Sequence, residues 1–267
     1  MIVAVKLGGA AIAYKSGVCE YSSHLDVILD QVQSAYEHLK AQGDTLILIH
    51  GAGSFGHPQA LKYQLKTGWS CLPESNQLKG LCHIRTTLQQ LNTKIIAGLD
   101  QRGLPVLSLS PMDYMIDQQD LLMDRVRRYL ELGCVPVLHG DVVLDRQRGL
   151  SILSGDRLLY LLSQSFPVTR CVFVTDVQGL FKADPKLKQA DSFVILPHFK
   201  CEGIEQDDPV MGPVVDVTGG MKAKVGWAKR IVKECETQVV LCRWGTIEAL
   251  DMMCLKETFT DQMTRFS

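Results

Sequence analysis

Continuous apolar segments of strand length alternate along this chain with segments whose apolar residues recur every three to four positions. Residues 46–49 and 171–174 are continuous apolar segments, whereas residues 25–39 and 88–99 carry stripes with the period of a helix. A strand that is apolar on both faces must be covered on both sides, as in a parallel sheet. The alternation therefore predicts an α/β protein, a three-layer αβα sandwich around a mostly parallel sheet.

The same reasoning gives the remaining elements. Further strands are predicted at residues 3–7, 105–109, 134–141 and 238–242, a hairpin at 141–155, and helices ending near Gly133, beginning near Asp156 and covering 221–235. Residues 182–216 have little periodicity and several prolines, which indicates an excursion between core elements. Because no repeat or linker interrupts the pattern, residues 1–267 are expected to form one domain with two lobes, approximately 1–165 and 166–267.

Composition excludes several classes of protein. The 28 Lys and Arg residues balance 29 Asp and Glu residues, a net charge of −1, so the basic excess of a nucleic-acid-binding protein is missing. No apolar run approaches the roughly 18 residues of a membrane span. The nine cysteines contain no C-x-x-C pair, which argues against a zinc site or a redox dithiol. We therefore expect a cytoplasmic protein with neither nucleic-acid nor membrane partners.

Three glycine-rich turns follow predicted strands, at residues 6–10 (KLGGA), 50–57 (HGAGSFGH) and 216–224 (DVTGGMKAK). The carboxyl ends of parallel strands share one edge of the sheet, so these turns can converge there. Glycines allow backbone N–H groups to approach phosphate oxygens, and a following helix adds its positive end. A GxxxxGK[ST] loop, a GxGxxG after the first strand and the protein-kinase motifs are absent from the sequence. A phosphate site in this chain would have to be built from loops and lysines.

These turns, together with HGD (139–141), LSGD (153–156) and TDVQGLF (175–181), resemble in order the motifs of the amino acid kinase superfamily. Within it, they are similar to the isopentenyl phosphate kinase family. GSFGH (53–57) is the most discriminating motif, because the amino-acid-specific members lack its histidine. The resemblance implies the amino acid kinase fold, with ATP on the lobe 166–267, the phosphate acceptor on the lobe 1–165, and a homodimer.

The resemblance also implies roles for individual residues. Lys6 and Lys224 match lysines that reach the ATP phosphates, Lys15 matches the lysine that stabilises the transition state, and Asp156 matches the carboxylate that orients the lysines. The other matching positions on the ATP side are Gly8, Gly9, Ala10, Gly53, Asp176 and Gly220. On the acceptor side they are Ala52, His57 and Gly155, with His57 holding the monophosphate. Mg²⁺ is expected to be carried by the nucleotide, since no dedicated metal ligands are visible in the sequence.

Two positions depart from the family pattern, Gln178 where aspartate is frequent and Ala10 where serine is frequent. Asp141 is compatible with either a turn or a functional role. The predicted helix around 78–95 could form one wall of an apolar pocket for the acceptor through Leu81, Ile84 and Leu88.

The implied activity is ATP-dependent phosphorylation of isopentenyl phosphate to isopentenyl diphosphate, a step of isoprenoid precursor synthesis. The alternatives are a kinase of another small phosphate or phosphonate such as fosfomycin, and a nucleotide-binding sensor without turnover. An amino acid kinase is disfavoured by His57, and a sensor would have no need of the transition-state lysine.

Overall fold

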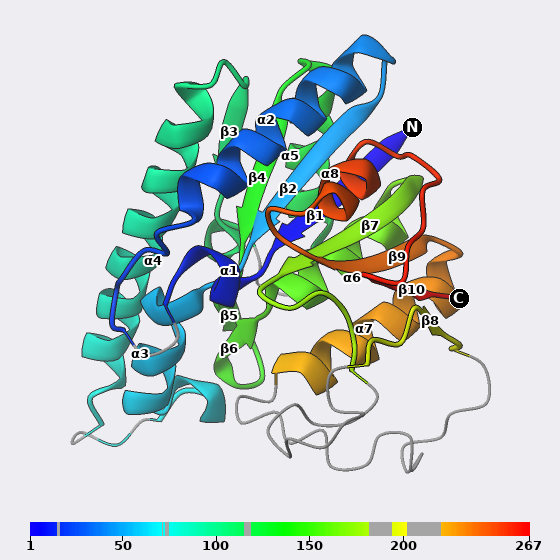
Figure 1. Cartoon of the computed structure of the whole chain (residues 1–267). Coiled ribbons are helices and arrows are strands. Elements are labelled where there is room, and N and C mark those ends of the chain that lie inside the picture. Colours follow the sequence, from blue (N-terminus) through cyan, green and yellow to red (C-terminus); the bar gives the residue numbers. More distant parts are fainter. Residues whose placement is uncertain (15–16, 71, 73–74, 115–118, 182–193, 202–219) are drawn as a thin grey trace.

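The computed structural model describes residues 1–14, 17–70, 72, 75–114, 119–181, 194–201 and 220–267. Within these residues the centre of the fold is a sheet with the strand order β3-β4-β2-β1-β7-β9-β10-β8 (Figure 1). Its strands are β1 (Ile2–Leu7), β2 (Thr45–His50), β3 (Val106–Leu109), β4 (Val135–His139), β7 (Val168–Thr175), β8 (His198–Phe199), β9 (Gln238–Arg243) and β10 (Thr264–Phe266).

Most of this sheet is parallel, as predicted. The strands from β3 to β9 in the sheet order pair in parallel, whereas β10 runs antiparallel to β9 and carries β8 alongside it. The predicted hairpin is also confirmed, as β5 (Asp141–Asp145) and β6 (Gly149–Leu153). From β1, the strand order runs through β2, β4 and β3 on one side and through β7 and β9 on the other. Where the strand order reverses in this way, as at β1, an α/β sheet has a crevice at the carboxyl ends of its strands.

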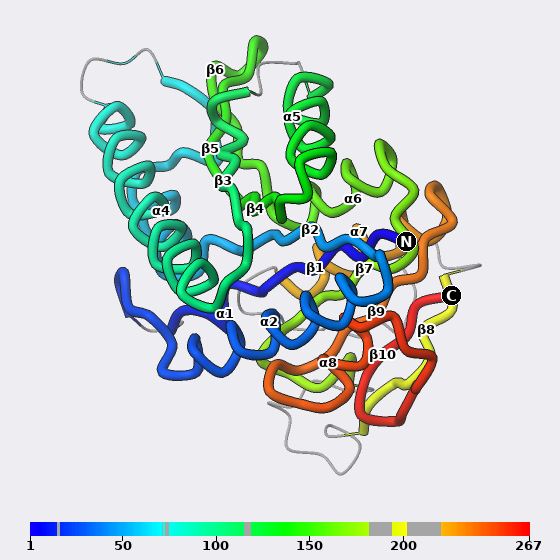
Figure 2. Tube along the Cα trace, turned by 90° about the horizontal axis from the view of Figure 1, so that it is seen from above, coloured from blue at the N-terminus to red at the C-terminus, as the bar shows by residue number. Residues whose placement is uncertain are grey.

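Helices cover both faces of the sheet, which gives the predicted three layers (Figure 2). The helices are α1 (Gly9–Ile12), α2 (Leu25–Ala41), α3 (His57–Lys62), α4 (Gln77–Asp100), α5 (Gln119–Glu131), α6 (Gly155–Ser165), α7 (Gly220–Cys235) and α8 (Ile247–Met253). Short 3-10 turns are η1 (Gly53–Phe55), η2 (Leu65–Thr67) and η3 (Pro111–Asp113). One core cluster joins α2, α4 and α8 to the sheet, and the other joins α5, α6 and α7 to its opposite face.

The pleat of β1 distributes its side chains between these two faces. Val3, Val5 and Leu7 pack into the cluster beneath α2 and α4, whereas Ala4 packs into the cluster beneath α6 and α7. Since successive side chains of a strand point to opposite faces, Lys6 lies on the same face as Ala4. A charged side chain at the end of a buried strand is thereby directed toward α6 and α7.

Some elements were not predicted. The short helices α1, α3 and α8 and the edge strands β8 and β10 are too brief to show a clear period in the sequence. The predicted excursion at 182–216 lies outside the described residues, apart from 194–201, which include β8. In the described part of the chain, no helix has both the length and the hydropathy that crossing a membrane would require.

Candidate active site

Two lysines and one aspartate meet at the carboxyl edge of the sheet. Lys6 Nζ lies 2.9 Å from Asp156 Oδ1, and Lys224 Nζ lies 3.4 Å from the same oxygen. All three residues are buried, with exposed fractions of 6% for Lys6, 8% for Asp156 and 9% for Lys224. Residues separated by up to 218 positions in the sequence therefore form one cluster. This agrees with the prediction that the turns after parallel strands converge at one edge of the sheet.

Local structure explains why each member of the cluster is in place. Asp156 is the second residue of α6, whose first turn is capped by Ser154, because the Ser154 hydroxyl accepts the Arg157 N–H at 3.1 Å. Gly155 leaves room beside it for the lysine, since a Cβ atom there would lie 2.8 Å from Cε of Lys6 and would displace that side chain. Lys224 lies on α7. Its ammonium also stands 5.1 Å above the ring of Phe173 on β7.

The charges of the cluster control one another. Burial alone would raise the pKa of Asp156, but the two neighbouring ammonium groups more than offset it and leave that pKa below its ordinary value. Burial and the charge of Lys6 lower the pKa of Lys224 to about 8, against the opposing effect of Asp156. Two cations against one anion leave a net positive charge in a buried place. Such a place favours an anionic ligand.

Glycines bring two of the predicted turns into direct contact beside this cluster. A Cβ atom on Gly9 would lie 2.5 Å from the backbone nitrogen of Gly53, which has a positive φ of 51°. A Cβ atom on Gly140, after β4, would lie 3.2 Å from the nitrogen of Gly155. The backbone segments can approach this closely only without side chains. The predicted convergence of the first two turns is thus confirmed, and the start of α6 joins them.

His57 begins α3 and is exposed to solvent. Partial desolvation by the surrounding protein, together with the positive charges of Lys66 and Lys6, lowers the pKa of His57, while the carboxylate of Asp156 opposes the shift. His57 is therefore within electrostatic range of the cluster. Lys66, on η2, is a cation that the sequence motifs did not single out.

The remaining predicted residues have varied surroundings. Gly8 donates its N–H to the carbonyl of Val174 at 2.7 Å, so this amide joins β1 to β7. Gly9 and Ala10 instead begin α1, where the first N–H groups have no partner within the helix. Gly220 is exposed at the start of α7.

Three more of the predicted site residues are Ala52, Asp176 and Lys15. Ala52 is half-buried, and its Cβ lies 2.6 Å from where a Cβ on Gly56 would be. Asp176 is half-buried after β7 and accepts the Thr175 hydroxyl at 3.1 Å. Lys15, the expected transition-state lysine, lies outside the described residues.

The positions left open by the sequence also have defined contacts. Gln178 donates to Gln262 at 2.9 Å and so joins the segment after β7 to the segment before β10. Asp141 is buried and paired with Arg85 of α4. Along α4, Ile84 and Leu88 are packed in the core, and Leu81 is partly buried against it. Among the described residues, no group of three or more His, Cys, Asp or Glu side chains could hold a metal ion.

Comparison with known proteins places the chain in a family. The model of the amino acid kinase family matches residues 1–243. The isopentenyl phosphate kinase of Methanocaldococcus jannaschii is 30% identical over 241 residues, which cover 86% of this chain and 87% of that protein. The isopentenyl phosphate kinase of Arabidopsis thaliana is 30% identical over 247 residues, which cover 85% of this chain and 71% of that protein.

Solved structures repeat the fold along the whole chain. An isopentenyl phosphate kinase superposes with a TM-score of 0.78 at 24% identity, covering 100% of both chains. UMP kinase from Ureaplasma parvum superposes with a TM-score of 0.61 at 12% identity, covering 100% of this chain and 98% of that one. At such identities the structural matches show only the fold, and the sequence matches show membership of the family. The chain belongs to the amino acid kinase family and is similar over most of its length to isopentenyl phosphate kinases.

Proposed function

We propose that the protein transfers the γ-phosphoryl group of ATP to isopentenyl phosphate and releases isopentenyl diphosphate and ADP. One observation carries the proposal: Lys6 and Lys224 share the buried carboxylate of Asp156 at the carboxyl edge of the sheet, and the charges of Lys6 and Asp156 also act on His57. Such a site can hold two anions near each other. The curated relatives named isopentenyl phosphate kinase support the choice of acceptor.

The lysine cluster serves the nucleotide. Phosphoryl transfer requires neutralisation of charge on the transferred group and an in-line arrangement of the attacking and leaving oxygens, rather than covalent catalysis. Lys6 and Lys224 contact the oxygens of the transferred phosphate, and Asp156 orients both amines and favours the protonated form of Lys224. The amides of Gly9, Ala10, Gly53 and Gly220 supply additional donors, and Asp176 lies on the nucleotide side. Lys15 stabilises the transition state.

The acceptor side needs no strong base. The second pKa of a phosphate monoester is about 6, so the attacking oxygen is already an anion near pH 7. That oxygen bonds to the γ-phosphorus of ATP while the bond from this phosphorus to the β–γ bridging oxygen breaks, and ADP leaves with the bond electrons. His57, with Ala52 and Gly155, holds the monophosphate, and Lys66 adds a positive charge beside His57. The side of α4 near Leu81 lies along the hydrocarbon tail.

Mg²⁺ fits this site as an ion carried by the nucleotide. The carboxylate of Asp156 is already engaged by two ammonium groups, which leaves it poorly suited to hold a metal of its own. When bound, Mg²⁺ supplies charge neutralisation on the phosphates. We also propose that the lobe 1–165 binds the acceptor, that the lobe 166–267 binds ATP, and that the protein is a cytoplasmic homodimer.

The test compares acceptors side by side. ADP release is measured with isopentenyl phosphate, dimethylallyl phosphate, fosfomycin and glutamate at equal concentrations of ATP and Mg²⁺. We expect isopentenyl phosphate to give the highest kcat/KM and glutamate to give no turnover. The Lys224→Met variant should lose this activity, whereas the matched variant Lys256→Met, at a lysine paired with Asp251 elsewhere, should keep it. Higher kcat/KM with fosfomycin, or no turnover with any acceptor, would refute the proposed substrate.

A further inference from the structure

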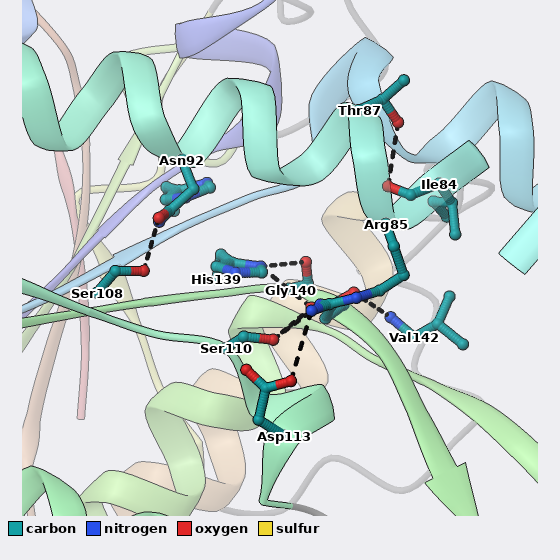
Figure 3. A network of polar contacts seen from close by, with 12 residues as sticks. Ile84, Arg85, Thr87, Asn92, Ser108, Ser110, Asp113, His139, Gly140 and Val142 are labelled. Atoms are coloured by element: carbon teal, nitrogen blue, oxygen red, sulfur yellow. Dashed lines mark hydrogen bonds and ion pairs between the residues drawn. The ribbon is translucent and has the colours of Figure 1, made fainter. Parts of the chain in front are cut away.

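A largely buried charged pair joins Arg85 of α4 to Asp141, the first residue of β5 (Figure 3). Arg85 donates from one guanidinium nitrogen to Asp141 Oδ2 and, at 2.8 Å, to the hydroxyl oxygen of Ser110. The Ser110 hydroxyl in turn donates to Asp141 Oδ2 at 3.0 Å, and the N–H of Val142 donates to Asp141 Oδ1 at 2.8 Å. Both carboxylate oxygens of Asp141 are therefore engaged, and its side chain is 0% exposed.

The pair is connected to the lysine cluster through the backbone. Asp141 directly follows Gly140, and a Cβ on Gly140 would lie 3.2 Å from the nitrogen of Gly155. Gly155 packs against the side chain of Lys6 and precedes Asp156, which holds both lysines. A shift of the turn at Gly140 would therefore be passed to the start of α6.

Two more polar side chains of α4 contact the glycine-rich segment 50–57. The hydroxyl of Thr87 donates to the carbonyl of Phe55, in the loop that leads to α3, at 2.6 Å. The amide of Asn92 donates to His50 Nε2 at 3.1 Å and accepts the hydroxyl of Ser108 at 2.6 Å. Burial, together with the neighbouring charge of His139, lowers the pKa of His50 to about 3, so its ring is neutral and can accept. α4 is thus tied to the segment 50–57 through Thr87 and Asn92, and to the turn at Gly140 through Arg85.

A buried ion pair adds little to the free energy of folding, because the loss of hydration of both charges offsets most of their attraction. It does fix geometry, since each partner has one low-energy arrangement. We propose that Arg85 and Asp141 are a positioning pair for the phosphate acceptor, which sets the spacing between the acceptor wall beside α4 and the Lys6–Asp156–Lys224 cluster. This inference rests on the proposed function.

The test uses a double variant that removes both charges and keeps a polar amide group at each position. Arg85→Gln or Asp141→Asn alone leaves a buried partner uncompensated and should lower the melting temperature strongly. The double variant Arg85→Gln/Asp141→Asn should recover most of that loss. If the pair positions the acceptor, kcat/KM for isopentenyl phosphate should still fall at least tenfold in the folded double variant, because small misplacements of reacting groups are costly. The KM for ATP should stay within twofold of the wild-type value.

The matched control is the ion pair at the other end of the same helix. Arg102 and Asp30 join the residues that follow α4 to α2; the Arg102 side chain has the same 17% exposure as that of Arg85, whereas Asp30 is 64% exposed, so this pair controls for loss of the arginine charge at the same helix. Arg102→Gln/Asp30→Asn should leave both KM values unchanged. A double variant at Arg85 and Asp141 with wild-type acceptor kinetics, or with equal increases in both KM values, would overturn the positioning role while the proposed function stood. A wild-type protein that is inactive with every acceptor would overturn both.

Discussion

The carboxylate of Asp156 can be removed with almost no change in shape by the substitution Asp156→Asn. The asparagine retains the volume but withdraws the carboxylate that lies 3.4 Å from the Lys224 ammonium and 2.9 Å from that of Lys6. In the wild-type protein, a pKa of about 8 leaves about half of the Lys224 side chains protonated at pH 8. Loss of an adjacent opposite charge lowers the pKa of such a lysine by about one to three.

The consequence depends on pH in a calculable way. If the pKa of Lys224 falls by about two, the protonated fraction at pH 8 drops about 50-fold, whereas at pH 6 it drops only about twofold. The kcat/KM for ATP reports groups of the enzyme form that ATP binds, here the complex with the acceptor, so it should show this difference. The assay is the pH profile of kcat/KM for ATP between pH 6 and pH 9, with isopentenyl phosphate saturating.

A matched variant separates the electrostatic effect from general damage. Asp251 has the same 8% exposure as Asp156 and pairs with Lys256 at 2.7 Å, but it belongs to α8. Asp251→Asn should therefore leave the pH profile unchanged. An Asp156→Asn variant whose activity loss is the same at pH 6 and pH 8 would refute the argument that the carboxylate acts by keeping Lys224 protonated.

Four further outcomes are expected. Lys15→Ala should mainly lower kcat in steady-state kinetics. His57→Ala should raise the KM for isopentenyl phosphate about tenfold or more, because a charge-assisted hydrogen bond to the phosphate is lost. An equal loss of ATP binding in the His57 variant would contradict its role. Gly53→Ala should destabilise the fold by about 1–3 kcal/mol more than Gly43→Ala in urea unfolding, because both have positive φ but only Gly53 would place a Cβ against neighbours, at 2.8 Å. The buried ring of His50 has a pKa lowered from 6.5 to about 3. As the pH falls, the imidazole of His50 is therefore protonated in the unfolded chain before it is protonated in the folded protein. Unfolding free energy should therefore fall by up to about 1.4 kcal/mol per pH unit below pH 6.5; a His50→Gln variant with an undiminished slope would count against this origin.

The sequence was most informative where one period dominates a long segment. The stripe of α2 and the continuous apolar runs of β2 and β7 predicted the layers, because burial on both faces of a strand leaves no room for alternation. The meeting of Lys6 with Asp156 could be expected from the shared edge of a parallel sheet. Its exact geometry follows from the pleat of β1, which becomes visible only once the two helical layers are assigned.

The positioning pair was not predicted, for a physical reason. Arg85 occupies the polar side of an amphipathic helix, where a charged residue ordinarily faces water. Its partner Asp141 is 56 positions away, and the contact depends on how α4 crosses the end of β3. Periodicity reports which side of a helix is apolar, but it does not report which polar side chain finds a buried partner. The short helices α1 and α3 were missed because fewer than two turns show no period.

The central claim is that one phosphate is transferred to another at the lysine cluster. Phosphorus NMR tests it most directly, with ATP, Mg²⁺ and isopentenyl phosphate incubated with the protein. We predict that the monophosphate resonance disappears while two coupled diphosphate resonances of the product and an equal amount of ADP appear. Formation of ADP with inorganic phosphate, and an unchanged monophosphate resonance, would contradict the account.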